Sequence, residues 1–408
     1  MDDAAARSAI EEVARHSYGR LVAFLAARSG DIAAAEDALS EAFGAALKHW
    51  PLEGVPEKPE AWLLRAARNR LVDAARHAAV RRRAEPLLKV AGEAEEVAHM
   101  HAPFPDERLK LLFVCAHPAI DAAVRTPLML QTVLVLDAAR IAAAFLVSPA
   151  AMEQRLVRAK TKIRETRIPF RVPEPSEWGE RVSFVLDAIY SAYNAGRDGE
   201  TDGATQHALA RDAIAIGRTL MQLVPDEPEA RGLLALMLHG EARRAARRDA
   251  GGAFVPLDRQ DTTLWSRPLM TEAEALLHRA ATFNRAGRYQ LEAAIQSIHA
   301  QRAVTGIIDW PEIALLYEGL VRLTPTIGAQ VGRAVAIAEA GDVAAGLAAL
   351  ERLPAERAAL YQPWWAARGH LLRRAGRDAE ARRAFERAAA LTDDPALRAH
   401  LLAQIAGG

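Results

Sequence analysis

The sequence predicts an all-α protein built from several helical domains, with almost no sheet. Ala, Leu, Arg and Glu dominate the 408 residues, and aromatic residues make up only 6% of them. These abundant residues are good helix formers, and runs of β-branched residues are short. Apolar residues recur at helical spacing in successive segments. The length exceeds that of one ordinary core, so we expect about two to four domains.

Residues 1–83 form the first predicted domain, in which breaks at residues 29–31 and 51–59 separate three helices. Asp31 can cap the second helix, and Pro59 suits the first turn of the third, where its missing N–H costs nothing. The second helix should be amphipathic. Its apolar positions are Ala35, Ala38, Leu39, Ala42, Phe43, Ala46, Leu47 and Trp50, and its outward positions are Glu36, Asp37, Ser40, Glu41 and Lys48.

Residues 84–105 are predicted to be a linker. They contain acids, Ala and three prolines, with no sustained period. Fully extended, the 22 residues could span about 70 Å, at about 3.3 Å each. This reach is long enough to place two modules well apart.

Residues 106–170 form a second helical domain that ends in a helix-turn-helix pattern. Asp137 can cap a helix over residues 138–145, and Ser148 with Pro149 can start the next helix. An apolar seam with Arg and Gln beside it is typical of a recognition helix that reads base edges and phosphates. The inward residues are Met152, Leu156, Ala159 and Ile163, and the surface residues are Glu153, Gln154, Arg155, Arg158, Lys160, Lys162 and Arg164.

The charge of the chain is unevenly distributed. The formal net charge is zero, which alone would argue against a nucleic-acid partner. Residues 65–83, however, hold seven arginines against one acid, and residues 153–171 hold seven Lys or Arg against two acids. Either segment by itself could be solvated helix surface. Together they favour contact with phosphates.

Residues 171–408 are predicted to form a helical extension of stacked helix pairs. Residues 365–395 fit one tetratricopeptide (TPR) repeat, with a turn at residues 375–377. A similar turn at residues 340–342 lies 35 residues upstream, and residues 286–289 mark an earlier unit. The repeat positions are Trp365, Gly369, Leu372, Ala381, Phe385 and Ala388.

Composition disfavours several classes of protein. The single cysteine, Cys115, excludes an intramolecular disulfide and a Cys-based zinc site, and we interpret His99, His101 and His117 as incidental polar residues. We therefore predict no metal and no cofactor. Without a secretory signal or about 18 consecutive apolar residues, a cytoplasmic protein is expected. No phosphate loop, nucleophile elbow or metal triad is evident, so we predict no catalytic residues and no enzyme activity.

Two pairs of segments resemble a known family. Residues 35–43 (AEDALSEAF) and 61–73 (AWLLRAARNRLVD) resemble conserved region 2 of the extracytoplasmic-function (ECF) sigma factors of the sigma-70 family. Residues 140–148 (RIAAAFLVS) and 154–160 (QRLVRAK) resemble the DNA-reading part of region 4. Segments 113–118, 168–170 and 185–196 resemble the long subgroup with a TPR-like C-terminal extension, so the resemblance covers essentially the whole chain.

The resemblance implies a binding role for each segment. Asp37, Glu41 and Phe43 would bind the clamp helices of the polymerase β′ subunit. Region 4 would also contact the β flap of the polymerase. The TPR-like domain could bind a protein or peptide partner, whose identity the resemblance leaves open. The −10 element would be held by Arg65, Arg68, Asn69, Arg70, Arg76, Arg81, Arg82 and Arg83, and the −35 element would be read by Ser148, Gln154, Arg155, Arg158, Lys160 and Lys162.

The sequence departs from its relatives before the helix-turn-helix. Residues 135–138 read VLDA where relatives often have Gly-Leu-Thr-Thr, so a turn glycine is lost and the entry to the motif should be altered. Residues 193–196 read YNAG where relatives usually end in Asn-Glu-Gly, which puts in doubt any coupling that depends on that Glu. Two alternatives remain: a helix-turn-helix regulator that does not bind polymerase, and a TPR-like interaction scaffold.

Overall fold

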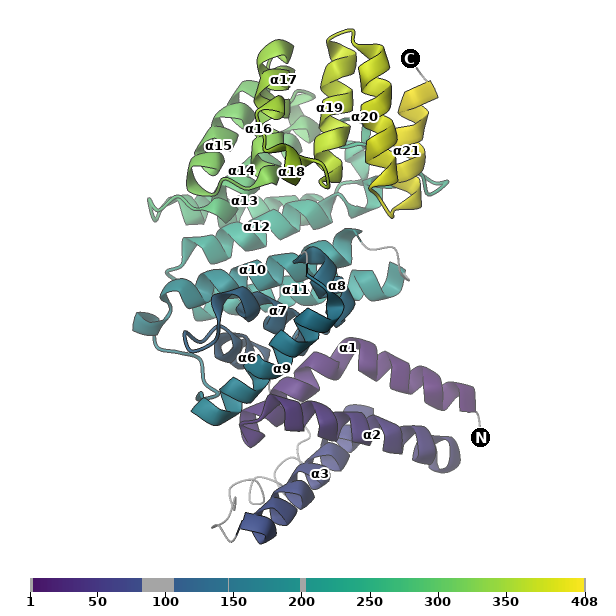
Figure 1. The fold of residues 1–408 in the computed structure, drawn as a ribbon, viewed down its shortest axis with the longest axis vertical. Helices are drawn as coiled ribbons and strands as arrows, with labels where there is room; N and C mark the ends of the chain where they lie inside the picture. The colour runs from purple at the N-terminus through teal and green to yellow at the C-terminus, as the bar shows by residue number, and fades with distance from the viewer. Residues whose placement is uncertain (1–2, 83–105, 146, 199–202, 407–408) are drawn as a thin grey trace. The chain divides into compact units, whose positions relative to one another are not determined.

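The computed structural model describes residues 3–82, 106–145, 147–198 and 203–406, and these residues form helices joined by short turns (Figure 1). Apart from one isolated antiparallel bridge between Arg248 and Phe254, the described residues contain no β-structure. The predicted all-α fold class is therefore confirmed. The predicted linker, residues 84–105, lies outside the described residues.

The described residues divide into two compact units. The N-terminal unit comprises residues 3–198 and 203–216, and the C-terminal unit begins at residue 217. The boundary falls inside helix α11 (Gly203–Leu223). Helix α10 (Gly179–Asp198), which the sequence assigns to the extension, thus belongs to the same compact unit as the helices before it.

Helices α1 (Asp3–Ser29), α2 (Ile32–Glu53) and α3 (Pro59–Arg82) open the N-terminal unit. Asp31 caps α2 as predicted, because its carboxylate accepts a hydrogen bond from the N–H of Ala34 at 3.2 Å. The predicted break at Pro51 is wrong by one turn. Pro51 lies inside the last turn of α2, and the helix still closes through the N–H of Gly54, which donates to the carbonyl of Trp50. The missing N–H of proline removes one bond here without ending the helix.

The amphipathic pattern of α2 is confirmed at most positions. Ala35, Leu39 and Trp50 are buried with their helical neighbours in the core of the unit. Leu47 was predicted to face the core, but its side chain is 51% exposed. Glu36 was predicted to face outward, but its side chain is only 20% exposed.

Four helices build the second part of the N-terminal unit: α6 (Arg108–Cys115), α7 (Ala122–Thr132), α8 (Ala138–Ala144) and α9 (Pro149–Thr166). Both predicted caps are confirmed. The carboxylate of Asp137 accepts from the N–H of Arg140 at 2.8 Å, and the hydroxyl of Ser148 accepts from the N–H of Ala151 at 3.3 Å. Helix α9 buries the four predicted residues Met152, Leu156, Ala159 and Ile163.

The entry to the predicted helix-turn-helix is strained at the position of the lost glycine. Val135 lies between α7 and α8 with φ of 57°, in the left-handed region. This backbone conformation costs an L-residue roughly 1–2 kcal/mol, and a β-branched residue adopts it rarely. The altered sequence therefore keeps the turn at the expense of local strain.

Helix α10 packs against α6 and α7. Its Arg181 is buried and donates a 2.7 Å hydrogen bond to the carbonyl of Phe113 in α6. Arg125 of α7 lies 3.8 Å from Glu180 and over the ring of Phe184. Val185 is fully buried beside them. These contacts explain why the first helix of the predicted extension belongs to the N-terminal unit.

The C-terminal unit is a series of helix pairs, drawn from teal-green to yellow in Figure 1. Gly376, with φ of 74°, turns the chain between two of these helices, and the side chain of Phe385 packs against Gly369 so closely that an added Cβ would lie 2.8 Å from the ring. The helices after α11 are α12 (Pro228–Ala242), α13 (Arg267–Ala281), α14 (Arg288–Thr305), α15 (Trp310–Leu323), α16 (Ile327–Glu339), α17 (Val343–Glu351), α18 (Ala355–Ala358), α19 (Gln362–Arg374), α20 (Asp378–Ala390) and α21 (Pro395–Ala406).

Candidate nucleic-acid interface

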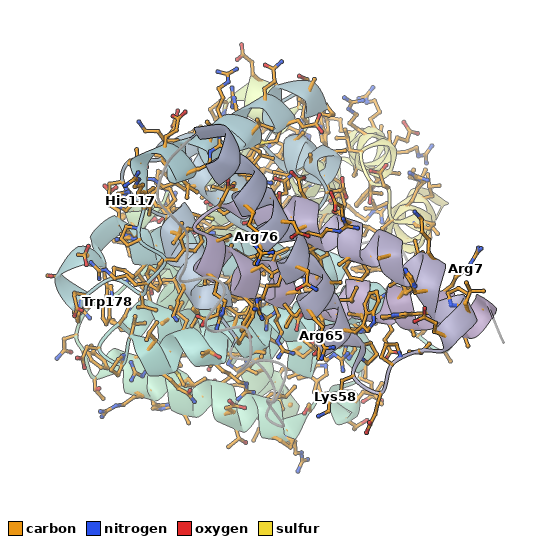
Figure 2. All side chains as sticks on the ribbon, turned by 90° about the horizontal axis from the view of Figure 1, so that it is seen from below. Arg7, Lys58, Arg65, Arg76, His117 and Trp178 are labelled. Atoms are coloured by element: carbon orange, nitrogen blue, oxygen red, sulfur yellow. The ribbon has the colours of Figure 1, made fainter. Side chains whose placement is uncertain are left out.

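Helix α3 presents a basic outer face. Leu63, Leu64 and Ala67 anchor the helix in the core, which turns Arg65 and Asn69 toward solvent. Figure 2 views the molecule from the side on which α3 lies and labels Arg65 and Arg76. Exposed guanidinium groups along one helix are suited to contact with phosphates.

A cation from α1 lies close to this basic face. Arg68 is half-buried, and burial followed by the nearby charge of Arg28 lowers the pKa of its guanidinium. Arg28 stacks over the ring of Phe24, 3.5 Å from its centroid, and donates to the carbonyl of the same residue. Sequence reasoning missed Arg28, because it lies at the end of a different helix and only tertiary packing brings it close to Arg68.

The predicted polymerase-binding acids and the predicted −10 face meet at one ion pair. Arg70 Nε lies 3.2 Å from Glu41 Oε2, and both side chains are about 60% exposed. Such an exposed pair contributes at most about 1 kcal/mol, so either residue can exchange it for a partner. Asp37 is exposed one turn before Glu41.

Phe43 lies away from the two acids. It follows Glu41 by two residues, which places it about 200° around the helix. Its half-buried ring stacks on Tyr18 of α1 at a centroid distance of 6.2 Å and an interplanar angle of 19°. The three residues predicted to bind polymerase therefore do not share one face of α2.

The basic run at the end of α3 is described only in part. Arg83 lies outside the described residues, and so do the side chains of Arg81 and Arg82. Arg76 is exposed, with Nη1 3.8 Å from Asp73 Oδ1.

Helix α9 begins at an exposed N-terminus that follows the turn of the predicted helix-turn-helix. Ser148 is exposed, and its hydroxyl already caps the helix. Gln154, Arg155 and Arg158 are exposed on the first half of α9, and Arg158 lies 3.4 Å from the side-chain oxygen of Gln154. Helix α9 has 18 residues and is about 27 Å long. The major groove of DNA is wide enough to admit an α-helix of this kind.

A basic cavity lies beside this face. It has a volume of about 340 Å³ and is bounded on one side by Arg155, Arg158 and Lys162 of α9. Its other side is formed by the start of α7, where the carboxylate of Asp121 caps the helix. Three cations facing one acid give the cavity a net positive charge, which favours phosphate oxygens.

Lys160 differs from the other cations of α9. Its ammonium lies 2.6 and 2.9 Å from the two carboxylate oxygens of Glu36, and its side chain is only 11% exposed. The sequence predicted Lys160 on the surface with its neighbours. In the structure it faces α2 instead, because residues 160 and 162 lie about 200° apart on the helix.

No cluster of side chains in the described part of the chain suggests a metal site. Within residues 3–82, 106–145, 147–198 and 203–406, no group of three His, Cys, Asp or Glu is placed to hold a metal ion. His117 uses its Nδ1 to accept from the N–H of Ala119, while His99 and His101 lie outside the described residues. Among the described helices, none has an apolar stretch long enough to cross a bilayer.

Comparison with known proteins gives two family matches and one relative. Residues 13–81 match the model of sigma-70 region 2, and residues 181–281 match a family of unknown function, DUF6596. An uncharacterized protein of Rhizobium meliloti (strain 1021) is 41% identical over 377 residues, which is 91% of this chain and 89% of that protein. No solved structure matches the chain. The first match covers α1 to α3, and the second runs from α10 into α13.

Proposed function

Because the chain belongs to the family of its Rhizobium meliloti relative and carries a sigma-70 region 2 in α1 to α3, we propose that it is an RNA polymerase sigma factor. In this proposal it directs promoter-specific initiation by binding core polymerase and the −10 and −35 elements. Sigma-70 factors initiate transcription by binding, so no bond chemistry is assigned to the chain.

The observation that carries the proposal is the order of two modules in one compact unit. The region 2 match is followed by α8 and α9, which we interpret as a helix-turn-helix, and the capped α9 has a buried seam and an exposed basic half. A sigma factor needs both modules on one chain, whereas an ordinary helix-turn-helix regulator needs only the second. The ECF assignment and the TPR-like nature of the extension belong to the proposal as well.

On the −10 side, the proposal assigns the opened non-template strand to α3 and its neighbours. Arg65, Arg70 and Arg76, with Arg28 beside Arg68, would hold phosphates of that strand. Capture of unstacked bases lowers the free energy of the melted state, so opening is a shift of population. Because the contacts are ionic, promoter affinity should fall steeply with salt.

On the −35 side, α9 would enter the major groove. Gln154 and Arg155 lie on its exposed first half and can reach base edges, while Arg158 and Lys162 line the cavity suited to phosphate. Ser148 would contact the backbone at the start of the helix.

The extension has a proposed regulatory role. Helix α10 contacts α6 and α7 through Arg181 and Arg125, so a signal received by the extension has a direct route to the −35 module. The alternatives are a regulator that does not bind polymerase and a protein-interaction scaffold, for which the helix pairs of the C-terminal unit are the supporting observation.

Binding to core polymerase tests the proposal. The full chain should bind purified bacterial core polymerase in a pull-down or by surface-based interferometry. Reversing the two exposed acids of α2 in the double variant Asp37→Arg with Glu41→Arg should weaken binding at least about tenfold, or about 1.4 kcal/mol. The matched control is Glu53→Arg, which reverses an exposed acid at the far end of the same helix.

The outcome separates the alternatives. Loss of binding in the double variant, with Glu53→Arg like wild type, supports a sigma factor that docks through this face. If the folded wild-type chain does not bind core polymerase, the chain is a regulator or a scaffold.

A further inference from the structure

A long loop between α12 and α13, residues 248–261, reaches the last helix of the C-terminal unit. Arg248 pairs with Asp394, the residue before α21, at 2.6 Å between Nη2 and Oδ2. The ring of Phe254 packs edge-on against His400 of α21, at a centroid distance of 5.3 Å. Helix α21 ends the chain in Figure 1, so this loop connects the first helices of the unit with its last one.

Arg302 of α14 holds the end of this loop. Its Nη2 donates to the carbonyls of Leu257 and Gln260, each at 2.9 Å, and its Nη1 donates to the carbonyl of Asp258. Its guanidinium lies over the ring of Trp265, 5.3 Å from the centroid. Among the described residues, the partners of Arg302 are thus backbone carbonyls and an aromatic ring, with no carboxylate. Its positive charge is therefore not neutralised by an ion pair.

Buried polar atoms without a partner gather around this guanidinium. The side chains of Gln260, Trp265 and His299 are only 8%, 3% and 8% exposed, and His299 precedes Arg302 by one turn of α14. The Nε2 of Gln260 donates to the carbonyl of Val255. A buried polar atom without a partner costs free energy, so a group of them indicates a partner from outside the chain. Among the described residues, these atoms find no hydrogen-bond partner: Trp265 Nε1, Arg302 Nε, His299 Nδ1 and Gln260 Oε1.

The chemistry of these atoms restricts the partner. The indole N–H of Trp265 and the Nε–H of Arg302 can only donate, so they need an acceptor. A second cation is near, because burial, followed by the charges of Arg243 and Arg302, lowers the pKa of His299 to about 4. Two cations favour a negatively charged acceptor. The amide oxygen of Gln260 can only accept, so it needs a donor such as a hydroxyl group.

We propose that Gln260, Trp265 and Arg302 form a binding site for a small molecule that carries an oxyanion, either carboxylate or phosphate, and a hydroxyl group. Trp265 Nε1 and Arg302 Nε donate to the oxyanion, and Gln260 Oε1 accepts from the hydroxyl. All three residues belong to the C-terminal unit. The site therefore does not depend on the sigma-factor function proposed for the N-terminal unit.

The loop of residues 248–261 covers this site, because three of its carbonyls bind the same guanidinium. At its far end the loop is held by Arg248 and Asp394, whose side chains are 44% and 23% exposed. A partly exposed ion pair contributes little stability, so this end can detach and admit a ligand without unfolding of a helix.

Nuclear magnetic resonance of the full chain tests the site directly. The chain contains seven tryptophans, so labelling with ¹⁵N-tryptophan gives one indole N–H signal for each. The signal missing from Trp265→Phe identifies Trp265. Glycolate and glycerol 3-phosphate are the probes, since each carries an oxyanion and a hydroxyl. At least one of them should move the Trp265 signal downfield to saturation, because the N–H gains a charged acceptor, whereas sodium chloride at equal ionic strength should not.

The two probes separate the two kinds of oxyanion. Saturation by glycolate alone identifies a carboxylate ligand, and saturation by glycerol 3-phosphate alone identifies a phosphate ligand. Either result supports the site, and so does saturation by both.

Calorimetry on variants assigns the contacts. Trp265→Phe keeps the ring and removes the donor, so affinity for the bound probe should fall about tenfold. The matched control is Trp364→Phe in the same unit, whose indole N–H already donates to the carbonyl of Leu350 at 3.0 Å and should not affect the probe. With a carboxylate ligand, acetate should bind at least about threefold more weakly than glycolate, and Gln260→Met should remove this difference. With a phosphate ligand, inorganic phosphate replaces acetate as the comparator.

Two results overturn the proposal. One is no saturable movement of the Trp265 signal with either probe up to about 100 mM, a concentration at which even millimolar affinity is detected. Ordered water would then be a sufficient partner for the buried atoms. The other is unchanged affinity in Trp265→Phe when circular dichroism shows that the variant is folded. If this variant does not fold, Gln260→Met decides, since a retained preference for the hydroxylated probe contradicts the site.

Discussion

The basic faces of α3 and α9 in the N-terminal unit use their charged residues differently from the helix pairs of the C-terminal unit. In the N-terminal unit, the cations predicted to contact DNA are mostly exposed, and their ion pairs, such as Arg70–Glu41, lie in solvent. In the C-terminal unit, titratable groups lie inside the packing: His239 is 1% exposed and His299 is 8% exposed. An exposed charge remains available to a partner, whereas a buried one is committed to the fold.

Glu229 illustrates the second case. From the start of α12, its carboxylate accepts hydrogen bonds from the N–H groups of Tyr289 and Gln290 at the start of α14. These are donors that a helix cannot satisfy by itself. One acid thus connects two helices of the C-terminal unit through their backbone. By contrast, Glu41 in the N-terminal unit pairs with the exposed side chain of Arg70.

The largest expected difference between the units is in their response to acid. Burial, followed by the charge of Arg243, lowers the pKa of His239 to about 4, and burial with Arg243 and Arg302 does the same for His299. Below pH 6.5 the unfolded chain takes up protons that the folded unit excludes, so stability falls as pH drops and levels off below about 4. Between pH 7 and pH 5 each histidine should remove roughly 2 kcal/mol.

Urea unfolding of the full chain at several pH values measures this effect. His239→Leu should flatten the pH dependence by about half. Glu274 lies 3.4 Å from His239 and would favour its protonation. A pH-independent stability of the C-terminal unit would mean that this acid outweighs burial and Arg243.

The next largest effect compares two glutamates. Glu229→Ala leaves the N–H groups of Tyr289 and Gln290 without their acceptor and should lower the free energy of unfolding by about 2–3 kcal/mol. Glu41→Ala removes only an exposed pair and should change it by less than about 1 kcal/mol. Hydrogen exchange of the α14 amides should rise in the first variant only. Equal effects of the two substitutions would contradict the contrast between the units.

The smallest effect on stability is expected at the basic face of α3. Arg65→Glu with Arg76→Glu changes exposed side chains and should shift the free energy of unfolding by no more than about 0.5 kcal/mol. The same variant should lose binding to a forked −10 oligonucleotide at least about tenfold, since the two proposed phosphate contacts would change from attractive to repulsive. A large loss of stability would assign these arginines to the fold instead of to DNA.

Local structure was predictable from the sequence because its causes are local. The caps Asp31, Asp137 and Ser148 each act on an N–H group three residues away, and the seam of α9 follows from helical spacing. Side-chain partners were less predictable because they depend on tertiary contacts. Lys160 and Lys162 have the same chemistry and lie two residues apart in sequence, yet only the packing of α9 on α2 decides that the first is shielded.

At the candidate site, too, features within one helix were predictable and contacts between helices were not. The exposure of Arg65 and Asn69 follows from the apolar spacing of Leu63, Leu64 and Ala67, but nothing near Arg68 in sequence indicates that Arg28 lies beside it. Phe43 follows Glu41 by two residues and was grouped with it, although helical geometry places the two on different faces.

In vitro transcription tests the central claim most directly. Purified core polymerase is combined with the full chain and a library of bacterial genomic promoter fragments, and the transcripts are sequenced. A sigma factor should produce transcripts that start at a defined set of promoters, and these should disappear with Asp37→Arg/Glu41→Arg but persist with Glu53→Arg. Transcripts that are the same with and without the chain, from a folded preparation, would contradict the account.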